Sequence, residues 1–166
     1  MPTPVARVLR VLLALLAAGL TDLRPGHAQQ PGGNALQEQL WDAARAGDTV
    51  AISQALAAGA RIDSLDTRRT PNGRRALNWA AWDNHAGTIR FLVAKGATVN
   101  VANLTGFTPL HHAAENGSLE AAQALLQAGA DPGLLSGAGE TAADVARRRN
   151  HPEVAAAIDA ARKPHQ

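Results

Sequence analysis

The chain has 166 residues, 46% of them hydrophobic but only 3% aromatic, which favours a helical solenoid built from small residues over a core built from large ones. It contains no cysteine, which excludes disulfides and thiol chemistry. The formal net charge of +2 comes from the first 28 residues, and the remaining basic and acidic side chains balance. The charge therefore gives no support to nucleic acid as a partner.

Residues 1–28 have the form of a signal peptide. They begin with Arg7 and Arg10, continue with an apolar run over residues 11–20, and end with small residues at Gly26 and Ala28. We expect a Sec-type signal cut after Ala28 and a periplasmic or secreted bacterial protein. An uncleaved anchor is the alternative, but the run is far shorter than the roughly 20 apolar residues that span a bilayer.

Residues 29–35 are rich in glutamine and glycine and are predicted to form a flexible linker. Asn34 and Gln37 are spaced as a capping pair, which predicts that the first helix begins there.

Four similar units are predicted to follow, over residues 36–65, 66–102, 103–135 and 136–161, before a tail at 162–166. Each has two short stretches with apolar residues at helical spacing, separated and ended by turn residues. The stripes of the first three units are Leu40, Ala43, Ala44 with Ile52, Ala55, Leu56; then Leu77, Ala80, Ala81 with Ile89, Leu92, Val93; then Leu110, Ala113, Ala114 with Ala122, Leu125, Leu126.

The third unit shows most clearly why each stretch is a helix. Thr108 is a good N-cap residue and Pro109 fits the first helical position, where no amide hydrogen is needed. The first helix is predicted to stop at Asn116 and Gly117, and Ser118 to cap the second. Helices this short cannot bury a core alone, so neighbouring units must stack.

The outer units carry the signs of array ends. The first has Glu38 and Asp42 on its first helix, and the fourth has Arg147 and Asp159 at positions that are apolar elsewhere. Terminal units of a repeat array need such polar outer sides because no further unit covers them. Between the first two units the spacing is four residues longer, within residues 66–75, which predicts either a longer binding loop or a neutral extension.

The sequence T-P-L-H-x-A at residues 108–113 and the period of about 33 residues resemble the ankyrin-repeat family over residues 36–161. The resemblance implies an all-α solenoid of about four helix-turn-helix units joined by short β-hairpin-like loops. It also implies a scaffold that binds a protein partner. We expect a monomer and, after cleavage of the signal, no stable membrane insertion.

In this family, partner contacts come from the hairpin tips and the exposed side of the first helices, which line a concave face. The resemblance implies a partner-binding site at the matching positions: Arg45, Arg68, Arg69, Arg74, Trp82, Asp83, Leu104, Thr105, Phe107, Glu115, Asn116, Arg148 and Arg149, with Arg75 and Glu140 on the same surface. Trp82 is the strongest candidate, because aromatic residues rimmed by arginines are typical of interface centres. Its alternative role is packing on the neighbouring unit.

The sequence shows none of the common catalytic, phosphate-binding or metal-binding motifs, so we expect no catalysis, cofactor or metal. His111 occupies the histidine position of the family signature and is expected to make structural hydrogen bonds. Two alternatives stay open. One is an accessory or protective subunit of an envelope enzyme, such as one that handles peroxide, and the other is a small enzyme using His112 or Asp83.

Overall fold

The computed structural model describes residues 31–162, where eight helices follow one another. They form four pairs, here called the first to fourth repeats: α2 (Pro31–Ala46) with α3 (Thr49–Ala57), α4 (Ala76–Trp82) with α5 (Ala86–Ala94), α6 (Pro109–Asn116) with α7 (Leu119–Gln127), and α8 (Ala142–Arg148) with α9 (Pro152–Ala161).

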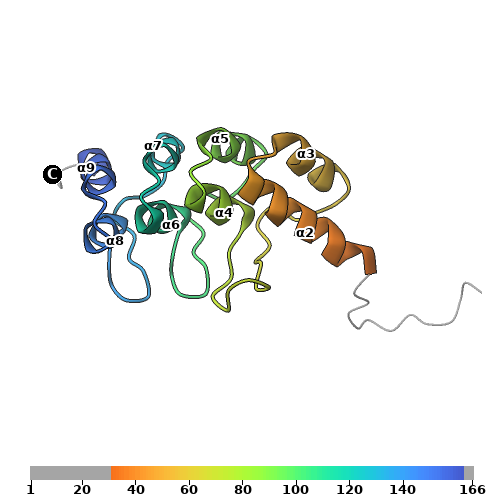
Figure 1. Ribbon diagram of the computed structural model, residues 1–166, viewed down its shortest axis with the longest axis horizontal. Coiled ribbons are helices and arrows are strands. Elements are labelled where there is room, and N and C mark those ends of the chain that lie inside the picture. The colour runs from red at the N-terminus through yellow and green to blue at the C-terminus, as the bar shows by residue number, and fades with distance from the viewer. Residues whose placement is uncertain (1–30, 163–166) are drawn as a thin grey trace, which may run out of the picture.

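The helices lie in two layers (Figure 1). The first helices of the repeats, α2, α4, α6 and α8, lie side by side, and α5, α7 and α9 pack along the other layer. Long loops, here called fingers, leave the second layer, project beyond the first and return to start the next repeat (Figure 1). The predicted all-α solenoid is confirmed, and it places the first helices and the fingers on one continuous face.

The predicted apolar stripes form the core, except that Leu56, Val93 and Leu126 are only partly buried and pack against it. In the third repeat Leu110, Ala113 and Ala114 are buried, and in the next layer Ala122 and Leu125 are buried with them. Alanines dominate the first-helix layer because a methyl side chain lets neighbouring helix backbones approach closely. The core is therefore a continuous band across the repeats, as stacking requires.

A reciprocal capping box fixes the start of α6. The Thr108 hydroxyl accepts a hydrogen bond from the His111 amide, and the Thr108 amide donates to Nδ1 of His111 at 3.3 Å. Pro109 occupies the first turn, and Gly117 ends the helix with a φ of 70°. These boundaries agree with the predicted ones. Ser118 differs, because its hydroxyl does not cap α7 but donates to the Trp82 carbonyl of the preceding repeat.

The fingers are tight antiparallel turns. Asp66 pairs with Arg74 and Leu135 with Thr141 through isolated bridges. The finger before α4 covers residues 58–75, whereas those before α6 and α8 cover residues 95–108 and 128–141, so the four-residue insertion lengthens the first finger. Adjacent fingers also bond to each other, since the Gly137 amide donates to the Thr105 carbonyl at 2.9 Å.

The predicted start of the first helix is wrong. Helix α2 begins at Pro31, so residues 31–35 are helical and not a linker, and Asn34 with Gln37 cannot be its N-terminal capping pair. Proline suits the first turn of a helix, so Pro31 is compatible with this start. Gln37 instead bonds both backbone polar groups of Arg61, joining α2 to the first finger. The predicted signal peptide lies outside the described residues.

The fourth repeat ends the array as its sequence predicts. Val145, Val154 and Ile158 are buried against the third repeat. Arg147 and Asp159, which replace apolar residues, form an ion pair with each other and remain about half exposed.

Candidate partner-binding face

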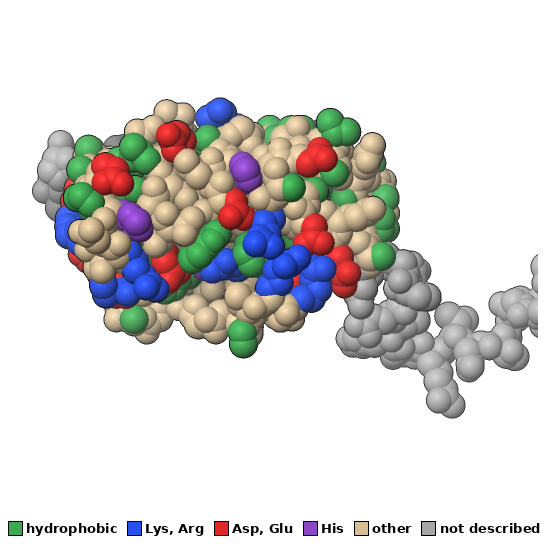
Figure 2. Space-filling model, viewed as in Figure 1, with side chains coloured by type: hydrophobic (Ala, Val, Ile, Leu, Met, Phe, Trp, Pro, Cys, Tyr) green, Lys and Arg blue, Asp and Glu red, His purple; other side chains and the backbone are tan. Residues whose placement is uncertain are grey.

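The exposed side of the first helices and the adjoining fingers is here called the first-helix face, and it carries many charged side chains. Figure 2 shows a band of Lys/Arg and Asp/Glu side chains crossing it, with hydrophobic side chains among the basic ones. Its positions come from all four repeats. The sequence-predicted binding residues belong to these elements, but the structure uses them in different ways.

Arg68 in the inserted finger is committed to its own fold. It forms ion pairs with Glu38, Asp42 and buried Asp66, and its guanidinium lies 4.9 Å from the ring centre of Trp41. Burial alone would raise the pKa of Asp66, but the hydrogen bonds and charge of Arg68 outweigh it and lower that pKa. Together with Arg69, which also pairs with Asp42, the insertion folds back onto α2.

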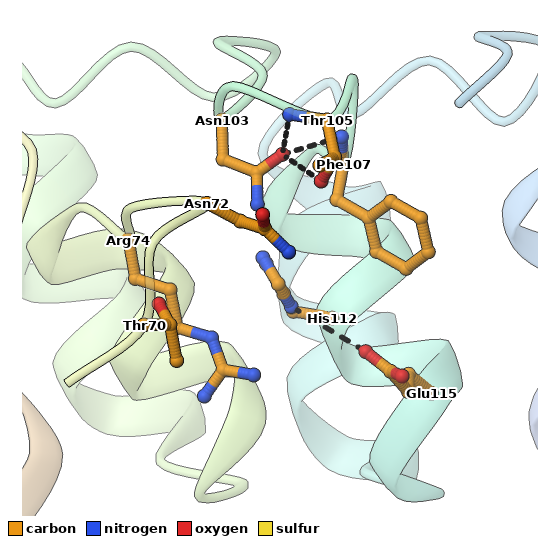
Figure 3. Close-up of a pocket in the computed structure, with 8 residues that line it drawn as sticks. All are labelled: Thr70, Asn72, Arg74, Asn103, Thr105, Phe107, His112 and Glu115. Carbon is orange, nitrogen blue, oxygen red and sulfur yellow. Dashed lines mark hydrogen bonds and ion pairs between the residues drawn. The ribbon is translucent and has the colours of Figure 1, made fainter. Parts of the chain in front are cut away.

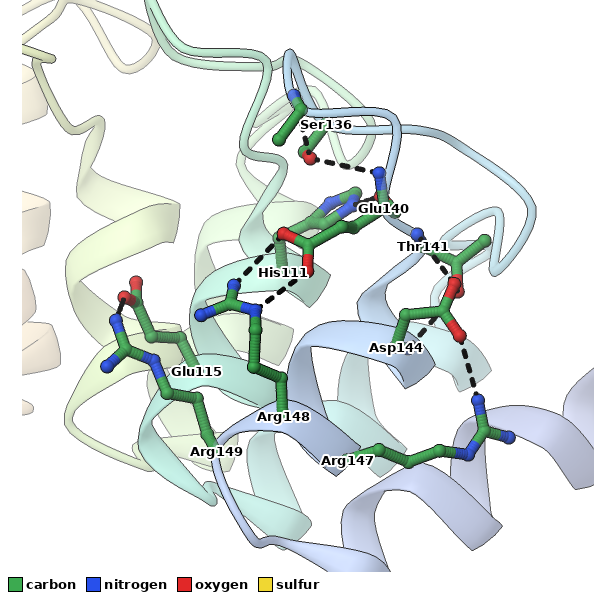
Figure 4. Close-up of polar contacts among 10 residues, drawn as sticks. His111, Glu115, Ser136, Glu140, Thr141, Asp144, Arg147, Arg148 and Arg149 are labelled. Atoms are coloured by element: carbon green, nitrogen blue, oxygen red, sulfur yellow. Dashed lines mark hydrogen bonds and ion pairs between the residues drawn. The ribbon is translucent and has the colours of Figure 1, made fainter.

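The fourth repeat binds its arginines to carboxylates as well (Figure 4). Arg148 holds Glu140 through two hydrogen bonds of 2.7 and 3.0 Å, and Arg149 holds Glu115 of the third repeat at 2.5 Å. In the first repeat, Arg45 pairs with Asp83 at 3.6 Å. The Arg149–Glu115 and Arg45–Asp83 pairs join adjacent repeats, whereas the Arg148–Glu140 pair holds the last finger against its own helix α8.

Two further predicted residues have internal hydrogen-bonding roles. The side-chain Nδ2 of Asn116 donates to the Trp82 carbonyl at 2.7 Å, and the Arg75 guanidinium donates to the carbonyls of Asp63 and Ala102. Leu104 and Thr105, at the tip of the finger before α6, remain exposed. Leu104 is 66% exposed, which makes it one of the most exposed large apolar side chains on the described residues.

Arg74 differs from the other arginines. Its guanidinium lies 4.6 Å from the ring centre of Trp79 and 4.1 Å from that of Trp82, within the range of cation–π contacts. Its side chain forms no ion pair or hydrogen bond with any residue between 35 and 162. Burial lowers the pKa of Arg74, and the charges of Glu115 and Asp83 oppose that effect, yet an arginine remains charged at neutral pH.

A hollow of about 330 Å³, here called the central pocket, lies beside Arg74 (Figure 3). Two fingers and α6 line it, through Thr70, Asn72, Arg74, Asn103, Thr105, Phe107, His112 and Glu115. Asn103 shapes the second finger, since its side-chain oxygen accepts hydrogen bonds from the amides of Thr105 and Phe107. The pocket thus has a rigid wall on that side.

His112 forms the back of the central pocket. Its side chain is 4% exposed, both ring nitrogens lack a hydrogen-bond partner, and the nearest carboxylate oxygen, on Glu115, is 3.9 Å from Nδ1. Burial, followed by the charges of Arg74 and His111, lowers its pKa to about 3, so the ring is neutral at physiological pH. Trp82 and Phe107 pack against the ring, with centroid distances of 6.2 and 5.5 Å.

His111 is structural, as predicted. Besides the capping box, its Nε2 lies 3.1 Å from the Glu140 carbonyl in the next finger (Figure 4). Burial lowers its pKa, and the Glu140 carbonyl partly offsets this effect. Residues 35–162 contain no group of three His, Asp or Glu side chains placed to hold a metal ion.

Comparison with known proteins now identifies the family. The family model for ankyrin repeats in three copies matches residues 40–136, which is more than half of the chain. The chain belongs to the ankyrin-repeat family. The matched segment includes the first three repeats and all three fingers before α4, α6 and α8 in whole or in part, so it contains the central pocket.

Several relatives share the ankyrin repeats. The chain is 35% identical over 107 residues to an ankyrin repeat domain-containing protein SAT10 of Stachybotrys chartarum, covering 64% of this chain and 5% of that protein. It is 33% identical over 147 residues to the E3 ubiquitin-protein ligase hecd-1 of Caenorhabditis elegans, covering 84% and 5%. It is 34% identical over 99 residues to a B-cell lymphoma 3 protein homolog of Mus musculus, covering 60% and 21%.

The chain therefore corresponds to about a fifth or less of each of these proteins, and the relatives with enzyme names match only through their repeats. Ankyrin repeats are general protein–protein interaction modules and a non-catalytic fold. Within residues 31–162, no helix has both the length and the apolar character needed to cross a membrane.

Sequence reasoning missed the central pocket. It placed four of the lining residues, Arg74, Thr105, Phe107 and Glu115, on the binding surface but weighed His112 only as an enzyme residue. The useful signal was that His112 directly follows the structural His111 on α6. Because His111 faces the next finger, His112 lies on the side of α6 that contacts the preceding finger.

Proposed function

We propose that this protein is an exported scaffold that binds a partner protein through its first-helix face and finger tips, without catalysis of its own. The observation that carries the proposal is the combination of exposed Leu104, the Arg74–Trp82 stack and the central pocket within one stretch of that face. Aromatic and arginine groups beside a hollow are typical of the centre of an interface. The sequence of residues 1–28 supports export.

The test compares two matched surface variants of the tagged full chain expressed in its native organism. Leu104 and Val50 are both 66% exposed, but Leu104 lies on a finger and Val50 on α3 in the other layer. We expect Leu104→Ser to reduce the stoichiometric recovery of a co-purifying protein several-fold and Val50→Ser to leave it unchanged. Equal recovery with both variants would show that the first-helix face is not the binding surface.

Mass spectrometry of the same samples tests the remaining parts of the proposal. A mature chain starting at Gln29 is the expected result for cleavage after Ala28, and a chain retaining residues 1–28 would contradict it. The identity of the partner separates the scaffold from the accessory-subunit alternative, in which one envelope enzyme would be the sole stoichiometric partner.

A further inference from the structure

We infer that the central pocket holds an acidic side chain of the partner, with its carboxylate placed between Arg74 and His112. This inference rests on the proposed function, because the carboxylate is assigned to a protein partner. It adds the chemical group that the partner must supply and the residues that receive it.

The first reason is that Arg74 has a charge without an acceptor. Five other arginines predicted to bind on this face lie against carboxylates within the described residues: Arg45 against Asp83, Arg68 against Glu38, Asp42 and Asp66, Arg69 against Asp42, Arg148 against Glu140, and Arg149 against Glu115. Arg75 donates to the backbone carbonyls of Asp63 and Ala102. Arg74 instead has its guanidinium fixed over two indole rings. A guanidinium held in one plane presents its donors in a fixed fork, which matches a carboxylate.

The second reason is that His112 is buried without a partner. Buried polar atoms are almost always hydrogen-bonded, and a buried imidazole with neither nitrogen bonded is an exception that needs a cause. A neutral ring can donate one N–H to an oxygen that enters from the pocket. The Thr70 hydroxyl, also buried and unpartnered, lines the same pocket.

The third reason is the shape and charge of the pocket. A volume of about 330 Å³ has ample room for an acidic side chain, and Phe107 provides an apolar wall for its methylene groups (Figure 3). Glu115 also lines the pocket, but one of its oxygens is bound by Arg149. The remaining negative charge of Glu115 favours a monoanion over a phosphate dianion, so a carboxylate fits better than a phosphate.

The experiment titrates the full chain with N-acetyl-L-glutamate methylamide, which carries one carboxylate, and with the neutral, nearly isosteric N-acetyl-L-glutamine methylamide. NMR would follow the ring signals of His112 and the indole N–H of Trp82. We expect saturable shifts of both signals with the acid at millimolar concentration and at least tenfold weaker binding of the amide.

Three variants locate the binding. Arg74→Met should abolish the acid-dependent shifts, while Arg147→Met, which changes an arginine on the outer face of the fourth repeat, should leave them unchanged. Glu115→Gln should strengthen acid binding several-fold, because it removes the competing charge. Circular dichroism of each variant confirms that it is folded.

Other outcomes would overturn the inference. Equal binding of acid and amide would show that the pocket does not select a charge, and acid binding that survives Arg74→Met would place it elsewhere. Tighter binding of O-phosphoserine by tenfold or more would assign the pocket to phosphate. If the partner is captured through Leu104 but the acid does not bind, this inference fails while the proposed function stands. If the acid binds but Leu104→Ser does not reduce recovery of the partner, the proposed function fails.

Discussion

Helix α6 contacts a neighbouring repeat on each side, and the polar groups at the two contacts differ. Toward α8, His111 uses both ring nitrogens, one in the capping box with Thr108 and one with the Glu140 carbonyl. Toward α4, His112 uses neither nitrogen. Both histidines are buried and adjacent in sequence, so burial alone does not explain the difference.

The contact of α6 with α8 has its buried polar groups hydrogen-bonded, whereas the contact of α6 with α4 does not. An unsatisfied buried polar group costs roughly 1–3 kcal/mol, and the side toward α4 contains His112 and Thr70 together with the unpaired Arg74. The side toward α8 has no such group among its described residues. The contact between α6 and α8 therefore needs no further hydrogen-bond partner, whereas the contact between α6 and α4 has donors and acceptors left for a ligand.

The largest change in stability is expected on the side of α6 that faces α8. His111→Ala removes the side-chain half of the capping box of α6 and the bond to the Glu140 carbonyl and leaves a cavity, so it should lower the free energy of unfolding by about 3 kcal/mol. Urea unfolding would measure the loss. His111→Asn should lose roughly half as much, because Asn78 shows that asparagine can cap the equivalent helix.

The two variants also test the role of the Glu140 carbonyl. Asparagine at position 111 keeps the cap but is too short to repeat the contact with the next finger. If His111→Asn were as stable as the wild type, the bond between repeats would contribute nothing, and the contrast between the two sides of α6 would weaken.

The second prediction concerns acid and His112. Its pKa is about 3 in the folded protein and near 6.5 when unfolded, so the unfolded state binds more protons between these values. The contribution of His112 to the free energy of unfolding is fully present above about pH 6.5, and it is lost as the pH falls toward 3. From pH 8 to pH 5 His112 should reduce the free energy of unfolding by about 2 kcal/mol.

His112→Leu is the matched variant for this prediction. It keeps a similar volume and cannot titrate, so its unfolding free energy should fall about 2 kcal/mol less between pH 8 and pH 5 than that of the wild type. Arg74 and His111, whose charges act on His112 in the same direction as burial, remain in place, as does Glu115. Identical pH dependence of the two proteins would mean that His112 is accessible to protons when folded.

Much of the fold could be predicted from the sequence because it depends on local patterns that repeat. The apolar stripes, the Thr108 cap, the Gly117 stop and the charged outer side of the fourth repeat each follow from residues within one or two turns. The start of α2 could not be predicted in this way, since a proline followed by two glycines is compatible both with a linker and with a first helical turn.

The site was harder to predict because it depends on which carboxylate each arginine reaches. Glu115 binds Arg149, which is 34 positions away in sequence and is not the only nearby cation. Arg68 folds back onto α2, whereas Arg74, in the same finger, stacks on indoles without an acceptor. Side-chain pairing over such distances leaves no periodic signal in a single sequence.

The smallest change in stability is expected at Arg74, beside the contact between α6 and α4. Arg74→Met loses the cation–π contacts with Trp79 and Trp82, but it also removes a desolvated charge without a carboxylate partner and keeps an apolar chain over Trp82. The opposing effects should change stability by less than about 0.5 kcal/mol. Arg68→Met, in the same finger, should cost about 2 kcal/mol, because it leaves buried Asp66 without its ion-pair partner. Urea unfolding of the two variants under the same conditions measures the difference. An equal loss from both would mean that Arg74 already has a structural role, and the pocket beside it would then need no ligand to account for it.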